Sequence, residues 1–163
     1  MQGEVSGLFI KYSADKLRQM SSHVEDCIGR LNDHQIWARG AASENSVGNL
    51  VLHLCGNVRQ WICSGVAGAK DVRDRDSEFA ATGGMSAADL IARMQTTVAE
   101  AVGIIEGVSA QRLTDQITPQ NHHVSVLEAI YQVVGHFQQH TGQIIFATKI
   151  FTGDDLGFYR PPK

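Results

Sequence analysis

The stretch VGHFQQHTGQII, residues 134–145, decides how we interpret the rest of the chain. Its two histidines, His136 and His140, are four residues apart in a long segment whose apolar residues recur at helical spacing. On an α-helix, residues i and i+4 lie one turn apart on one face, so both imidazoles can reach the same metal ion. The same pair also arises by chance on helices that carry histidine. A third ligand elsewhere in the chain would favour the metal interpretation.

Length and charge limit the classes of protein to consider. The 163 residues fit a single domain, residues 1–163, and suffice to bury a core. The 14 Lys and Arg are balanced by 17 Asp and Glu and form no basic patch, so nucleic acid is not an expected partner. The first residues, MQGEVS, do not resemble a signal peptide, and no run of about 18 apolar residues occurs. We therefore expect a soluble cytoplasmic protein without a membrane partner.

Four segments carry apolar residues at helical spacing, and cap residues mark several of their ends. Ser86 and Ser125 suit N-caps, and Glu128 completes a capping box with Ser125. Gly107 and Gly153 suit helix ends. The predicted helices span residues 6–31, 47–64, 87–106 and 126–151. This pattern predicts an all-α fold, an antiparallel four-helix bundle, in which facing helices can share a metal site.

His53 lies in the second predicted helix, beside its apolar stripe and not within it. At about 100° per residue, its arc is shared with polar residues and one glycine. These neighbours are Ser46, Asn49, Gly56, Asn57 and Gln60. Such an arc is either a solvent-facing surface or the wall of a site, where a missing side chain leaves room. Together with His136 and His140, His53 would give three nitrogens and leave a coordination position open, as in catalytic sites.

Other polar segments carry weaker signals. The segment KDVRDRDSE, residues 70–78, is of mixed charge and predicts a solvated loop. Its aspartates lack the glycine and the final glutamate of a calcium loop. The adjacent His122 and His123 lie in an irregular segment, where we expect exposed side chains that can rim a pocket.

The cysteines and the C-terminal aromatic residues are interpreted as structural. Cys27, Cys55 and Cys63 are odd in number and lack CxxC spacing, so we expect reduced, buried thiols. Phe158 and Tyr159 follow the last helix in a tail with two prolines. They either fold over a pocket mouth or pack on the bundle, and we expect packing.

Two motifs together resemble a known family. NSVGNLVLHLCGN, residues 45–57, and HxxxHTGQI, residues 136–144, are similar to motifs of the DinB-like (YfiT-like) metalloenzyme superfamily. The resemblance covers nearly the whole chain in helix order and spacing. It implies an up-down-down-up bundle, usually a homodimer, that binds a divalent metal, zinc or nickel, through His53, His136 and His140. Characterised relatives include bacillithiol transferases and mycothiol-dependent maleylpyruvate isomerase, which are thiol-dependent enzymes.

Three functions are compatible with such a site. A bound metal lowers the pKa of a coordinated thiol or water, so the expected function is a thiol-dependent S-transferase that joins a low-molecular-weight thiol to a small electrophile. A metal-dependent hydrolase of a small molecule is the alternative, and a non-catalytic dimeric metal-binding stress protein is the third. Peptide hydrolysis is disfavoured because no HExxH glutamate adjoins a ligand. Candidates for hydrogen bonds to ligand or substrate are Asn57, Gln60 and Gln143, with Asn49 and Gln132 beside them; otherwise these residues are solvated helix surface.

Overall fold

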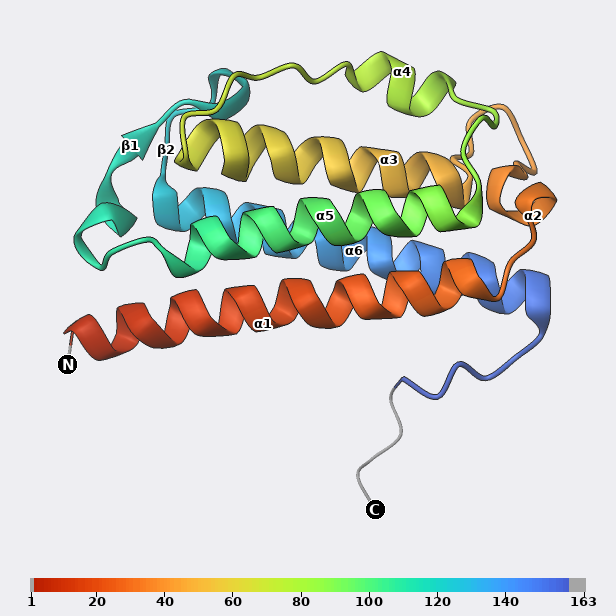
Figure 1. Ribbon diagram of the computed structural model, residues 1–163, viewed down its shortest axis with the longest axis horizontal. Coiled ribbons are helices and arrows are strands. Elements are labelled where there is room, and N and C mark those ends of the chain that lie inside the picture. Colours follow the sequence, from red (N-terminus) through yellow and green to blue (C-terminus); the bar gives the residue numbers. More distant parts are fainter. Residues whose placement is uncertain (1, 159–163) are drawn as a thin grey trace.

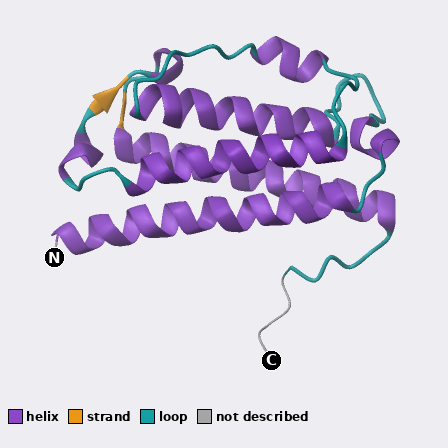
Figure 2. Cartoon of the chain, in the orientation of Figure 1, coloured by secondary structure: helices purple, strands orange, loops and turns teal. Residues whose placement is uncertain are grey.

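The computed structural model describes residues 2–158, which form the helical bundle drawn in Figure 1. The long helices are α1 Gln2–Gly29, α3 Val47–Val58, α5 Ala87–Glu106 and α6 Val126–Thr152. The shorter elements are α2 Asp33–Trp37, the π-helix η1 Arg59–Val66, α4 Arg75–Ala80, the 3-10 turns η2 Gln111–Thr114 and η3 Pro119–Asn121, and the strands β1 Gln116–Ile117 and β2 Val124–Ser125. The all-α prediction is confirmed, although β1 and β2 pair in a short antiparallel ladder that periodicity did not predict (Figure 2).

Helix ends follow the local capping chemistry of the sequence. Ser46, Ser86 and Ser125 each accept a hydrogen bond from the backbone N–H three residues later, and all three form capping boxes. Gly153, with φ 74°, ends α6 in the left-handed conformation that suits glycine. The predicted starts of the helices at residues 47, 87 and 126 are confirmed. The second predicted helix is α3 continued without a break by η1.

The four long helices pack around one core. α1 packs against α5 and α6, and α3 packs against the same two helices. Figure 1 shows α1 and α6 running in one direction and α3 and α5 in the other. Neighbours α3 and α5 are therefore parallel, as are α1 and α6, so the predicted bundle is antiparallel only between the other neighbours. Leu17, Leu54, Met94 and Ile130 are fully buried, one from each long helix.

The parallel arrangement of α3 and α5 dictates a long connection between them. Residues 67–86 must return along the bundle before α5 can begin, and Figure 2 shows this crossover passing along α3. It contains α4, which packs on α3. The predicted solvated loop is therefore wrong for Arg73 and Glu78, whose side chains are 4% and 8% exposed. Their charges neutralise each other, so they can be buried together where the crossover packs on α3.

The remaining structural expectations concern thiols and the tail. Cys27, Cys55 and Cys63 are free and buried, as predicted, and burial raises the pKa of Cys55 and Cys63 to about 11. The Phe158 ring stacks on His23 of α1 with centroids 4.1 Å apart, so this aromatic packs on the bundle. Tyr159 lies outside the described residues.

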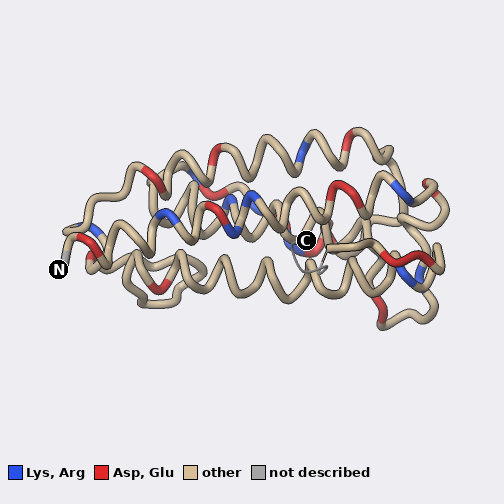
Figure 3. Tube along the Cα trace, turned by 90° about the horizontal axis from the view of Figure 1, so that it is seen from below, with Lys and Arg blue, Asp and Glu red and all other residues tan. Residues whose placement is uncertain are grey.

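The charged residues of the folded chain form no dominant patch. Figure 3 shows basic and acidic residues interspersed along the helices. None of the described helices combines the length and apolarity needed to cross a bilayer.

Candidate metal centre

Three histidines from two helices converge on one point. His53 extends from α3, and His136 and His140 extend from successive turns of the antiparallel neighbour α6. His136 Nε2 lies 3.1 Å from His53 Nε2 and 3.2 Å from His140 Nε2. One potential ligand atom from each histidine lies within 4.8 Å of the other two. Among the His, Cys, Asp and Glu residues in the described part of the chain, these three form the group that is spaced to hold a metal ion. The structure thus brings together the three residues that the sequence singled out.

A buried ion pair fixes the orientation of His53. Its Nδ1 lies 3.0 Å from Glu78 Oε2, and Arg73 donates to both oxygens of Glu78, from Nε at 2.7 Å and from Nη2 at 2.8 Å. Burial alone would raise the pKa of Glu78, but the hydrogen bonds from Arg73 and His53 outweigh it and hold the pKa below its usual value. Arg73 Nη2 also lies 3.0 Å from His53 Nδ1, but it already donates to Glu78 Oε2. Because the ionised carboxylate only accepts, we assign the proton of His53 to Nδ1. Its Nε2 lone pair then faces the other histidines, as in carboxylate–histidine–metal arrangements.

A glycine makes the approach of Glu78 to α3 possible. A Cβ at Gly56 would lie 1.8 Å from Glu78 Oε1 and 2.9 Å from Arg73 Nε, so no larger residue fits without displacing the ion pair. Asn49 holds the same segment by its backbone, donating from Nδ2 to the carbonyl oxygens of Glu78 and Ala81, each at 2.8 Å. Asn49 is therefore an anchor for the crossover.

The two histidines on α6 are held differently. His140 Nδ1 lies 2.6 Å from Gln143 Oε1, a carbonyl oxygen that accepts, so the His140 proton also belongs on Nδ1 and its Nε2 lone pair also faces inward. His136 Nδ1 is buried and has no hydrogen-bond partner among the described residues. Gln143, one of the predicted candidates, thus orients His140.

The electrostatic surroundings keep His136 and His140 neutral. Burial lowers the pKa of His136 to about 4, and the nearby histidines and arginines add to the effect. Burial also lowers the pKa of His140, although the hydrogen bond to Gln143 opposes it. Neutral imidazoles are the form that binds metal ions, so no proton has to be displaced near pH 7.

The donor set fits a first-row divalent ion. Two imidazoles have lone pairs fixed toward a shared point by Glu78 and Gln143, and the third imidazole faces both of them. Three nitrogen ligands leave at least one coordination position for a small molecule.

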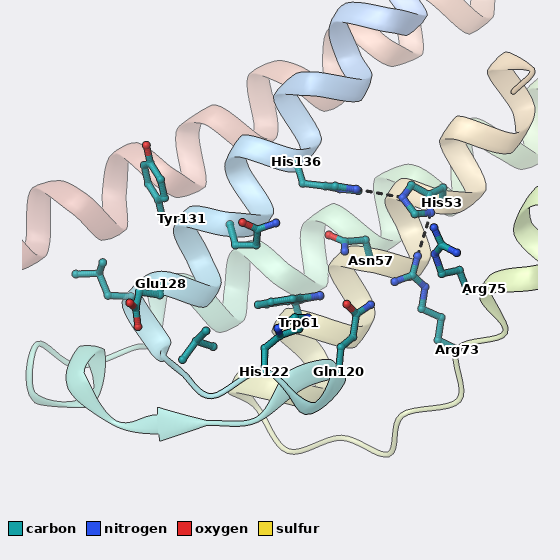
Figure 4. Close-up of a pocket in the computed structure, with 13 residues that line it drawn as sticks. His53, Asn57, Trp61, Arg73, Arg75, Gln120, His122, Glu128, Tyr131 and His136 are labelled. Atoms are coloured by element: carbon teal, nitrogen blue, oxygen red, sulfur yellow. Dashed lines mark hydrogen bonds between the residues drawn. The ribbon is translucent and has the colours of Figure 1, made fainter. Parts of the chain in front are cut away.

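A cavity of about 560 Å³ opens beside His53 and His136 (Figure 4). The other lining residues are Asn57, Trp61, Arg73, Arg75, Gln120, His122, Val124, Leu127, Glu128, Tyr131 and Gln132. Their mixture of aromatic, polar and charged groups is typical of small-molecule sites.

Some of the predicted polar candidates line the cavity, and others lie behind the residues that line it. Asn57 lines the cavity, and its Oδ1 is buried without a partner among the described residues. Gln132 also lines the cavity, as does His122, which stacks on Trp61 with ring centroids 6.0 Å apart. Gln60 does not line it, because it accepts from Arg73 and donates to Asp71 in the layer behind the wall.

Sequence reasoning missed Arg73, Arg75 and Glu78. All three lie in the mixed-charge segment, whose composition is that of a solvated loop. The available signal was Gly56, one turn from His53 on the same arc, because a glycine there indicates that another group approaches α3 closely.

Comparison with solved structures shows the same fold in proteins of low sequence identity. A conserved protein from Enterococcus faecalis superposes with a TM-score of 0.73 at 15% identity, covering 88% of this chain and 97% of that one. The DinB-like protein YjoA from Bacillus subtilis gives 0.70 at 16% identity, covering 93% and 99%.

A structure of a histidine-to-alanine mutant of mycothiol-dependent maleylpyruvate isomerase also superposes. It gives a TM-score of 0.65 at 12% identity, covering 83% of this chain and 60% of the isomerase. None of the curated proteins compared matches this sequence.

A family model covers nearly the whole sequence. The family described as a protein of unknown function, DUF1572, matches residues 4–160. The chain therefore belongs to the DUF1572 family, and it shares its fold with DinB-like proteins.

Proposed function

We propose that His53, His136 and His140 bind a divalent metal ion, zinc or nickel, and that the protein is a metal-dependent enzyme acting on a small molecule. The observation that carries this proposal is the convergence of three imidazole Nε2 atoms, two of them in tautomers fixed by Glu78 and Gln143. Three histidines crowded without an ion would have to share protons at close range, whereas a bound cation uses all three lone pairs.

The activity that the site supports best is transfer of a low-molecular-weight thiol to a small electrophile. A bound metal lowers the pKa of a coordinated thiol, so that thiolate is available at neutral pH. The thiolate sulfur would attack the electrophilic carbon, and a C–S bond would form as the leaving group departs with its electron pair. The cavity offers room for both molecules beside the histidines, and a superposing isomerase is named for its dependence on a thiol.

The position of Glu78 favours transferase over hydrolase. Both of its oxygens accept hydrogen bonds from Arg73, and one also contacts His53, so this carboxylate is a poor proton acceptor. Glu128, which does line the cavity, is engaged by Ser125. A thiol loses its proton on binding metal and needs no protein base, whereas a hydrolase gains from one. Hydrolysis of a small molecule is therefore our second candidate.

We further propose that the protein is a homodimer. Large apolar side chains on α1 and α6 are each 65% exposed or more, which is unusual for a surface that stays in water. They are Val5, Leu8 and Tyr12 on α1 and Tyr131, Phe146 and Ile150 on α6. Light scattering coupled to size-exclusion chromatography tests this, and a monomer at all protein concentrations would contradict it.

Elemental analysis of protein purified without an affinity tag tests the metal proposal. We expect near-stoichiometric zinc or nickel, and we expect His53→Ala, His136→Ala and His140→Ala each to abolish tight binding of added metal. His123→Ala, an exposed histidine that does not line the cavity, is the control. Unchanged metal binding in the three variants would refute the site.

Turnover separates an enzyme from a metal-binding protein without activity. We expect metal-loaded protein to conjugate a thiol from a panel of low-molecular-weight thiols to 1-chloro-2,4-dinitrobenzene, and the His136→Ala variant to lose this activity. A metal-loaded protein with a coordinatively closed ion and no turnover with any thiol would instead support the non-catalytic interpretation.

A further inference from the structure

The charged side chains around the cavity differ in whether another residue already pairs with them. Besides the histidines, Arg73, Arg75 and Glu128 line it. Arg73 is neutralised by Glu78, and Glu128 accepts hydrogen bonds from the backbone N–H and hydroxyl of Ser125, each at 2.7 Å. Arg75 has no ion pair or hydrogen bond with any residue in the part of the chain that the structure describes. Its charge therefore remains available to a ligand.

Arg75 is nevertheless held in place. Its guanidinium lies over the ring of Phe79, 4.9 Å from the centroid, and the Phe79 ring in turn packs on His53 with centroids 4.7 Å apart. A guanidinium held over an aromatic ring still has N–H groups free for a ligand. The two ring contacts place Arg75 next to the candidate metal ligand.

The segment that carries Arg75 is itself anchored. Asn49 and Arg39 donate to backbone carbonyl oxygens of residues 78–81, and Glu78 contacts His53. An arginine on a fixed segment loses less conformational freedom on binding than one on a mobile loop.

The cavity is thus polarised along its length. Figure 4 shows Arg73 and Arg75 at the end near His53, and Tyr131 and Glu128 at the opposite end. A ligand that extends from the histidines would present its first polar group to Arg75 and its less polar remainder to Trp61 and Tyr131.

We propose that Arg75 binds a carboxylate of the small molecule that occupies this cavity, and so selects carboxylate-bearing ligands over neutral ones. Arginine presents paired N–H donors that match the two oxygens of a carboxylate. The inference rests on the proposed function, which supplies the thiol and the electrophile, and the carboxylate can belong to either.

Binding of matched thiols to cobalt-loaded protein tests the first source. The acids mercaptoacetate, 3-mercaptopropionate and 4-mercaptobutyrate are compared with the mercapto alcohols of the same chain length, and the thiolate-to-cobalt absorption band reports binding without turnover. We expect the best acid to bind roughly tenfold more tightly than its alcohol, as one charge-assisted contact allows. Arg75→Gln should remove this preference, and Arg75→Lys should restore part of it. Arg93→Gln removes the same charge at an exposed position outside the cavity and should change nothing.

The second source is tested with a matched pair of electrophiles. The rate of conjugation to 2-mercaptoethanol is compared for iodoacetate and iodoacetamide, each corrected for the reaction without protein. A preference for iodoacetate that Arg75→Gln abolishes assigns the carboxylate to the electrophile, and a preference confined to the mercapto acids assigns it to the thiol. Either result supports the proposal.

The proposal fails independently of the proposed function. If the acid and neutral members of both pairs behave alike in the wild type, or if Arg75→Gln and Arg75→Lys weaken both members equally, Arg75 does not recognise a carboxylate, although the metal enzyme stands. Saturation-transfer NMR on metal-free protein covers the opposite case. If cobalt does not load but the mercapto acids still bind in preference to the alcohols, and only while Arg75 is present, the metal proposal falls and this inference stands.

Discussion

The two sides of the candidate metal centre are built on different principles. On the crossover side, His53 is oriented by Glu78, a carboxylate that is 8% exposed and paired with a buried arginine. On the α6 side, His140 is oriented by an exposed glutamine, and the His136 Nδ1 has no described partner. The helix backbone alone places the α6 pair at the correct spacing, whereas His53 depends on a segment from elsewhere in the chain. Mutations of the supporting residues should therefore have unequal effects.

The largest effect is expected for Glu78→Gln. This change leaves the Arg73 charge buried and unpaired, which should lower the free energy of unfolding by about 3 kcal/mol. It should also weaken metal binding roughly 10- to 100-fold, because the partner that fixes the His53 tautomer is lost. Denaturant unfolding of the metal-free protein and competition titration with a chelator measure the two effects.

Glu100→Gln is the control for that change. Glu100 pairs with Arg59 at the surface, where both side chains are more than 40% exposed, and its loss should cost less than about 1 kcal/mol. Equal effects of Glu78→Gln and Glu100→Gln would remove the distinction between the two sides.

A pair of glycine substitutions should change stability in opposite directions. Gly56→Ala forces Glu78 and Arg73 apart, so we expect a loss of roughly 2 kcal/mol, within the range for overpacked sites, together with weaker metal binding. Gly142→Ala, at an exposed position of α6, meets no neighbouring atom within 4 Å and should gain up to about 1 kcal/mol from helix propensity. Thermal unfolding with and without metal measures both variants. If Gly56→Ala instead stabilised the protein, Glu78 and Arg73 would not lie in close contact with α3 in solution.

Acid should weaken the two sides of the metal-free protein in different pH windows. Burial lowers the pKa of His136 from 6.5 to about 4, so the unfolded chain takes up this proton first, and the associated stability is lost as pH falls from about 6.5 towards 4. The pKa of Glu78 is lowered from 4.5, so its contribution is present above that value and lost as pH falls below it. Because His136 is only partly buried, solvent screening reduces the loss of stability that its titration causes. We expect this loss to appear as a fall in Tm of roughly 3–6 °C.

Two variants assign these windows. Thermal unfolding between pH 8 and pH 3.5 should show that His136→Asn flattens the upper part of the profile and Glu78→Gln the lower part. If His136→Asn leaves the profile between pH 6.5 and 4 unchanged, the histidine is protonated in the folded protein at higher pH than its environment implies.

The smallest effect is expected for Gln143→Ala. The side chain is exposed and makes one neutral hydrogen bond to His140, so metal affinity should fall about two- to fivefold, with little change in stability. A loss as large as that of Glu78→Gln in the same chelator competition would show that the α6 side needs its partner as much as the crossover side does.

The same difference explains what could be predicted from the sequence. Helical periodicity and capping serines are local signals, so the long helices and the shared face of His136 and His140 follow from neighbours in the chain. Arg73 and Glu78 could not be predicted because their burial depends on α3 and α5 being parallel neighbours, which forces the crossover over His53. Composition cannot distinguish an arginine and a glutamate that pair in the interior from the same residues in water. Tyr12 recurs at helical spacing with the apolar residues of α1 and is nevertheless 65% exposed, because periodicity defines a face and not what covers it.

His53 and His136 are 83 positions apart in the chain, although their nitrogens almost touch. A growing polypeptide that has emerged only as far as α5 holds one of the three histidines, and even a released chain must close the bundle before the other two can join it. For the proposed metal site, the separation orders events in time: assembly of the tertiary structure would precede capture of the ion. A tightly held metal would then mark chains that have finished folding, and its loss would be an early sign that α3 and α6 have come apart.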